Sequence, residues 1–237
     1  MFQAAQLKFI NEETLLVEFG ETLEDDIYQR VLNLDAALNG SIIARHLETL
    51  PTFRSLMIRF DASEIAPDAL LLSLADLNSV QVSLNSTRWR VPICFEGECA
   101  EDLSEAAKLL NMPEDTLISR LLAHPLRLYM YGFAPGFAYL GGLDEQLTLP
   151  RRKDPRAPMP VGALMIAGGL ASITSVSMPT GWYVLGQTPL AMFSAEREPM
   201  VPFAVGDELH LYRISLNNFS SMQGSDDLGM IKQLGSQ

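Results

Sequence analysis

Cysteine and histidine are scarce in this chain, since its 237 residues include two cysteines and three histidines. Cys94 and Cys99 are separated by four residues, and no histidine lies near them in the sequence. Two sulfur ligands alone make a poor zinc site, and neither thiol has the basic neighbours that activate a nucleophile. We therefore expect no metal site and two free thiols. A disulfide between them is the alternative, although a chain of this length does not need one.

Long apolar runs and an excess of basic residues are also absent. The most apolar segment, residues 69–77, contains Ser73 and Asp76 and is too short to span a bilayer. Lys and Arg total 17 against 29 for Asp and Glu, which gives a formal net charge of −12. Nucleic acids and anionic membranes are bound through basic patches, so the composition argues against both as partners. The N-terminus has no recognisable secretion signal, and we expect a cytoplasmic protein.

The first third of the chain alternates strand and helix periodicities. Residues 55–60, for example, place Leu56, Ile58 and Phe60 on one side of a strand. Two helices packed on one antiparallel sheet would bury the apolar positions of both, so we predict a two-layer α/β domain over residues 1–85. The expected strands are residues 7–10, 14–19 and 55–60, and the expected helices are residues 22–39 and 67–77.

Beyond residue 86 the pattern changes to two short helices followed by short strands with turn-rich spacers. This pattern is typical of a closed or nearly closed β-barrel, which we predict over residues 86–216. The expected strands are residues 89–95, 126–131, 163–167, 171–176, 182–186, 190–193 and 208–214, and Asp102 with Glu105 indicates a cap for the first of the two helices. Pro92 interrupts the first strand and predicts that it lies at an edge. Residues 217–237 are rich in Ser, Gly and Asp, so we expect a flexible tail there.

One segment, residues 131–189, concentrates glycine, proline and aromatic side chains. It opens with Tyr-Gly-Phe-Ala-Pro-Gly-Phe-Ala-Tyr-Leu, continues through two Pro-Arg pairs at residues 150–151 and 155–156, and closes with Pro-Thr-Gly-Trp at residues 179–182. Glycine and proline fix special backbone angles, aromatic rings form apolar walls, and guanidinium groups bind carboxylate or phosphate. The segment therefore indicates a cleft for a small anionic ligand. A barrel with many tight turns and solvated loop charges is the alternative.

In this order the motifs resemble the allophanate hydrolase subunit 1 family, which includes the B-type component of bacterial 5-oxoprolinase and an inhibitor of a sporulation histidine kinase. The resemblance covers about residues 6–214. It implies an α+β fold, with a small ferredoxin-like α/β sandwich followed by a cyclophilin-like β-barrel. It also implies a B-type subunit of an ATP-dependent hydrolase that opens 5-oxoproline to glutamate, in a hetero-oligomer with C-type and A-type subunits. ATP would be bound within that complex. A non-catalytic regulator that binds and inhibits a histidine kinase is the alternative.

The resemblance also implies which residues bind the substrate, while the catalytic residue stays unknown. Relatives carry a histidine in the helix before the first motif, where this chain has Leu121. His124, one helical turn later, is the remaining candidate for proton transfer, and contact with the free carbonyls of the helix end is its alternative role. The implied substrate-binding residues are Gly132, Phe133, Pro135, Gly136, Phe137, Tyr139, Arg151, Arg156, Gly168, Gly169, Gly181 and Trp182.

Overall fold

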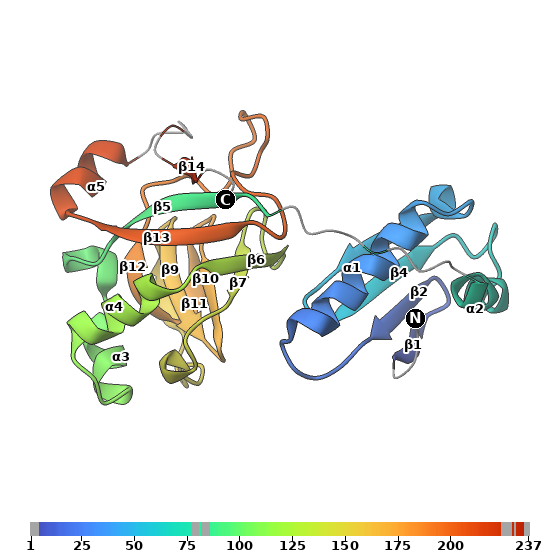
Figure 1. Cartoon of the computed structure of the whole chain (residues 1–237), viewed down its shortest axis with the longest axis horizontal. Helices are drawn as coiled ribbons and strands as arrows, with labels where there is room; N and C mark the ends of the chain where they lie inside the picture. Colours follow the sequence, from blue (N-terminus) through green and yellow to red (C-terminus); the bar gives the residue numbers. More distant parts are fainter. Residues whose placement is uncertain (1–4, 77–80, 82–85, 224–228, 230, 235–237) are drawn as a thin grey trace. The chain divides into compact units, whose positions relative to one another are not determined.

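The computed structural model describes residues 5–76, 81, 86–223, 229 and 231–234. It divides the chain into two compact units, residues 1–84 and 85–237 (Figure 1). The first unit is an α/β sandwich and the second is a closed β-barrel with few helices, which confirms the predicted α+β fold class.

The first unit is a four-stranded antiparallel sheet, in the order β1-β2-β4-β3, with two helices on one face. Leu15 of β2 and Ile58 of β4 share one buried cluster with Leu34 of α1 and Leu70 of α2. Alternate residues of the strands face this cluster, as the two-residue period of a strand requires. The elements are β1 (Gln6–Asn11), β2 (Thr14–Glu18), α1 (Asp25–Asn39), a 3-10 turn (Ala44–His46), β3 (Leu47–Pro51), β4 (Ser55–Phe60) and α2 (Pro67–Asp76).

The second unit is a barrel of seven strands, β12-β9-β10-β7-β6-β13-β5, which closes through a β12–β5 pairing. Its interior is a continuous apolar cluster that also takes in the buried faces of α3 and α4. A small two-stranded sheet of β8 and β11 is separate from the barrel. The elements are β5 (Arg88–Cys94), a 3-10 turn (Gly97–Ala100), α3 (Leu103–Leu109), α4 (Glu114–Ala123), β6 (Leu126–Tyr131), β7 (Ala138–Gly141), a 3-10 turn (Glu145–Leu147), β8 (Arg156–Met159), β9 (Ala163–Ala167), β10 (Leu170–Ile173), β11 (Met178–Thr180), β12 (Tyr183–Gln187), β13 (Glu208–Ile214), α5 (Leu216–Met222) and β14 (Lys232–Leu234).

One expectation for this unit is wrong. The strand with Pro92 is not at an edge: β13 pairs with all of β5, while β14 pairs only with residues 88–90 and β12 only at Cys94. Pro92 lies between the parts of β5 that pair with β14 and with β12, so its missing N–H removes no bond to either of these strands. The segment from residue 217 carries most of α5 and all of β14, while residues 224–228, 230 and 235–237 of the expected flexible tail lie outside the described residues. Phe219 of α5 is buried against the two cysteines, and Ile231 is buried in the barrel core.

Candidate functional site

A pocket of about 160 Å³ lies in the barrel unit, where three motif segments meet. The segments are the turn between β6 and β7, the loop before β8, and the β11–β12 turn. Six of the implied substrate-binding residues line it, and three others were missed although they belong to or adjoin the Pro-Thr-Gly-Trp motif. The lining residues are Phe133, Phe137, Tyr139, Arg151, Met178, Pro179, Thr180, Gly181 and Trp182.

Four aromatic rings form one continuous wall of this pocket. Ring centroids are 5.6 Å apart for Phe133 and Phe137, 5.0 Å for Phe137 and Tyr139, and 6.2 Å for Tyr139 and Trp182. Tilted and edge-to-face pairs of this kind contribute about 0.5–1.5 kcal/mol each beyond area burial. Phe137 and Trp182 are buried, whereas Phe133 is 80% exposed at the rim. The wall is therefore rigid at its base and open to solvent at one end.

The turn that carries Phe133 depends on unusual backbone geometry. Gly136 has a φ of +70°, and an added Cβ there would lie 2.8 Å from the Met192 carbonyl oxygen, so only glycine fits. Phe133 itself has a φ of +67°, which is rare for a bulky side chain. Backbone outliers of this kind cluster at functional sites, because surrounding structure must hold them in place. Gly132 and Pro135 belong to the same turn but do not line the pocket.

Arg151 is the one cationic side chain among the residues that line the pocket. Its guanidinium lies 5.9 Å from the centre of the Trp182 ring. Burial raises the pKa of Tyr139, while the charge of Arg151 acts in the opposite direction. Tyr139 is therefore a neutral hydroxyl at physiological pH and can donate a hydrogen bond beside a positive charge. The pocket combines an aromatic wall, a cation and a neutral donor.

Arg156, the other arginine of the Pro-Arg pairs, does not line this pocket. It donates to Glu101 at 2.9 Å and contacts Asp102, whose side chain is completely buried. Arg152 donates to Glu105 at 2.7 Å and to the same Asp102 at 3.1 Å. These guanidiniums are engaged within the protein, so Arg151 is the arginine of the loop that is placed to meet a ligand. The sequence indicated Asp102 only as a helix cap, and in the structure its side chain makes no capping bond to α3.

The remaining implied residues lie away from the pocket lining. Gly168 and Gly169, with φ of +59° and +77°, form the two-residue turn of the β9–β10 hairpin. His124 follows the last residue of α4 and lies near Asp144. Asp144 is itself paired with Arg120 at 2.8 Å. The titratable side chains of the pocket are thus Tyr139 and Arg151, which suit recognition of an anion better than proton transfer.

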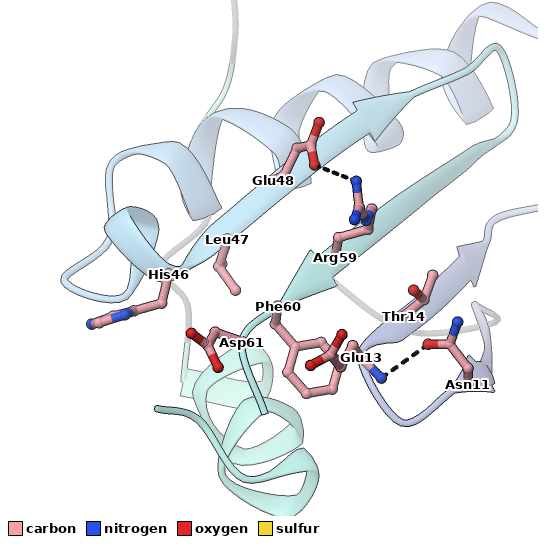
Figure 2. Close-up of a pocket in the computed structure, with 9 residues that line it drawn as sticks. All are labelled: Asn11, Glu13, Thr14, His46, Leu47, Glu48, Arg59, Phe60 and Asp61. Atoms are coloured by element: carbon pink, nitrogen blue, oxygen red, sulfur yellow. Dashed lines mark hydrogen bonds and ion pairs between the residues drawn. The ribbon is translucent and has the colours of Figure 1, made fainter. Parts of the chain in front are cut away.

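The first unit has a wider and more polar hollow of about 450 Å³. Figure 2 shows Glu48 and Arg59 facing each other there, and their charges are paired at 2.8 Å. The backbone N–H and the hydroxyl of Ser63 both donate to the Asp61 carboxylate and lower its pKa, so this carboxylate is also bound within the protein. None of the motif residues lines this hollow. The barrel pocket is therefore the better candidate site.

The described part of the chain shows neither a metal cluster nor a membrane-spanning helix. No group of His, Cys, Asp or Glu side chains among those residues could hold a metal ion, and both cysteines are free and buried. The helices within those same residues are too short or too polar to cross a membrane.

Comparison with known proteins gives consistent matches. The family model described as carboxyltransferase domain, subdomain C and D, matches residues 5–203. The 5-oxoprolinase B subunit of Bacillus subtilis is 27% identical over 227 residues, covering 90% of this chain and 95% of that protein. The crystal structure of TTHA0988 aligns with a TM-score of 0.74 at 26% identity, over 85% of this chain and 39% of that one, so this chain spans about two fifths of it. The crystal structure of Kluyveromyces lactis urea carboxylase shares the fold, with a TM-score of 0.77 at 17% identity. The alignment covers 97% of this chain and 24% of the urea carboxylase chain.

Proposed function

The chain belongs to the family of carboxyltransferase domains with subdomains C and D, and from that premise we propose that it is a B-type subunit of an ATP-dependent 5-oxoprolinase-like hydrolase. The complex opens the cyclic amide of 5-oxoproline to glutamate, together with A-type and C-type subunits. The similarity to a 5-oxoprolinase B subunit over nearly the whole of both chains supports this assignment. We place the complex in the cytoplasm, where ATP is available.

The convergence of the motif residues on one small pocket is the observation that carries the proposal. Its volume of about 160 Å³ is well below the roughly 300–1,000 Å³ of sites for drug-sized ligands. A five-membered lactam carboxylate matches a pocket of this size, and ATP does not. The nucleotide therefore binds elsewhere in the complex.

The chemistry of the lining suits a lactam carboxylate. Arg151 pairs with the carboxylate, and the ring lies against the aromatic wall formed by Tyr139 and Trp182. Tyr139 donates to a carbonyl oxygen of the ligand, since its hydroxyl stays protonated. Opening the lactam also needs activation by ATP and a group that moves a proton. The partner subunits supply both, because the pocket lining holds no general base with a suitable pKa.

The test is turnover of 5-oxoproline by the chain alone and by the complex with A-type and C-type subunits. We expect ATP-dependent glutamate formation only in the complex. Arg151→Gln should lower kcat/KM about 10- to 100-fold, which corresponds to about 1.5–3 kcal/mol for a lost charged hydrogen bond. Arg59→Gln, which removes an exposed cation of the first unit, is the matched control and should leave turnover unchanged. Strong lactam hydrolysis by the isolated chain would contradict the proposal.

A regulatory role is the second candidate, and the exposure of Phe133 favours it. Its ring is 80% exposed on a turn with a positive φ, and exposed aromatic side chains are enriched at protein interfaces. If the chain inhibits a histidine kinase through this residue, the isolated chain will slow kinase autophosphorylation and Phe133→Ala will relieve the inhibition. Inhibition that is equal for both proteins would exclude Phe133 as the anchor.

A further inference from the structure

The barrel seam between β12 and β5 is closed by a single residue pair, Gln187 with Cys94. Farther along β12, the strand backbone makes its hydrogen bonds with Asp102 instead of with β5. The backbone N–H of Asp102 donates to the Val184 carbonyl at 2.9 Å, and its carboxylate Oδ2 accepts from the Val184 N–H at 2.9 Å. Asp102 therefore holds the backbone of β12 two residues after Trp182.

The second carboxylate oxygen of Asp102 reaches the arginine loop. Oδ1 accepts from Arg152 at 3.1 Å and also contacts Arg156. The backbone N–H of Arg152 donates to the Gly181 carbonyl at 2.8 Å, so the loop is also tied directly to the β11–β12 turn. A fully buried carboxylate is tolerated only when it is paired and hydrogen-bonded, and this one accepts from Arg152, Arg156 and the β12 backbone. Asp102 thus connects the two segments that carry Arg151 and Trp182.

Arg151 itself has no such support. It makes no ion pair with any residue that the structure describes, and it is exposed beside the Trp182 ring. The direction of its side chain thus depends on the backbone of the loop, which the neighbouring Arg152 anchors. A binding group must be held close to its productive geometry by a supporting shell, or affinity is lost to the cost of ordering it.

We propose that Asp102 is a positioning residue of the pocket, which fixes Arg151 over Trp182 by holding Arg152 and Val184 together. This inference rests on the proposed function, since it takes Arg151 to be the group that binds an anion. Asp102 touches no ligand in this scheme. It determines where the cation lies, and it does so from a helix start that is distant in sequence.

Quenching of Trp182 fluorescence tests the proposal without a known ligand. The chain has two tryptophans, so Trp89→Phe leaves Trp182 as the only reporter. Iodide is an anionic quencher that Arg151 attracts, whereas acrylamide is neutral. A unit charge 5.9 Å away changes the local iodide concentration roughly threefold in a water-like dielectric. Arg151→Gln should therefore lower the ratio of iodide to acrylamide quenching constants by about threefold.

Asp102→Asn should also lower the ratio of iodide to acrylamide quenching constants, although Arg151 is still present. The drop should be at least half of the drop seen in Arg151→Gln. Arg152→Gln breaks the same link while keeping the Asp102–Val184 bonds, and it serves if Asp102→Asn does not fold. Asp207→Asn is the matched control: this buried aspartate loses its Trp89 donor in the Trp89→Phe background but still accepts from the Thr87 and Ala204 N–H groups, so the variant should lose stability with an unchanged ratio. A purely structural role for Asp102 would instead raise both quenching constants together.

The outcomes separate the two proposals. A normal ratio in Asp102→Asn and Arg152→Gln, with a lowered ratio in Arg151→Gln, overturns the positioning role and leaves the anion pocket standing. A normal ratio in Arg151→Gln overturns the anion pocket, and the positioning role with it.

Discussion

The two units of this protein differ in what they bury. The core of the first unit is apolar, and Thr14 is its one buried polar residue among those the structure describes. The barrel buries several polar residues, including Asp102, Ser172, Thr174 and Asp207. Most of the chain's net negative charge lies instead in the first unit, on its surface. One unit is held together by apolar layers, while the other also relies on buried hydrogen bonds.

Several buried polar groups of the barrel hold strands, turns and loops in place. The Thr174 hydroxyl accepts from the Ala163 N–H and donates to the Pro160 carbonyl, both at 2.8 Å. The Ser172 hydroxyl donates to the Ala138 carbonyl at 2.8 Å. Satisfied networks of this kind rigidify a structure, and partly broken ones are costly. The candidate pocket lies in the unit that uses buried polar groups to hold its loops.

The largest effect expected is from removing a buried charge in the barrel. Asp102→Ala leaves Arg152 and Arg156 without their shared partner, so it should destabilise the barrel by about 3–5 kcal/mol. Both tryptophans lie in the barrel unit, so denaturant unfolding followed by fluorescence reports on it. Glu48→Ala removes an ion pair of the first unit whose two side chains are 60% and 58% exposed. It should lower the free energy of unfolding by less than about 1 kcal/mol, measured by circular dichroism. Equal costs for the two would remove the contrast between the units.

A pair of glycines gives a second, smaller contrast. Gly136→Ala places a Cβ 2.6 Å from the Cβ of Phe193 at a φ of +70°, so we expect a loss of about 1–3 kcal/mol and a displaced Phe133 turn. Gly40→Ala at the end of α1 has a φ of −88° and a nearest contact of 3.4 Å, and should be almost neutral. Unfolding midpoints of both variants in the same denaturant check this. A neutral Gly136→Ala would show that the turn can rearrange.

The last effect is absent at neutral pH and appears only at high pH. Burial raises the pKa of the Cys99 thiol from 9.0 to about 12, with a hydrogen bond to Cys94 as the next cause. Because the folded pKa is the higher one, its contribution to stability is complete below pH 9 and is lost as the pH rises from about 9 to 12. Cys99→Ala should therefore flatten the decline of barrel stability over this window. Asp61→Asn should not, since the pKa of Asp61 is lowered and its effect appears on the acid side. If barrel stability declines as steeply in Cys99→Ala as in the wild type, other groups cause the decline.

Periodicity along the chain was enough to find the longer elements. Strands over residues 55–60, 126–131, 163–167 and 208–214 were predicted with the bounds that the structure has, because their apolar residues alternate or run continuously. The short strands β3, β7, β8, β11 and β14 were missed, and residues 190–193 form no strand although one was expected. Three to five residues carry too little periodicity, so their pairing is decided by what lies beside them.

By itself the sequence determined the α+β fold class and, through local motifs, pointed to the aromatic side chains of the pocket. Only the tertiary structure decided which arginine lines that pocket. Arg151 and Arg156 follow prolines in the same way, and local sequence offers no means of separating them. The choice depends on Asp102, 54 positions before Arg156, whose burial against β12 brings its carboxylate to Arg152 and Arg156 and leaves Arg151 at the pocket. A buried charge must find its partners wherever the fold places them, and those partners are not neighbours in the chain.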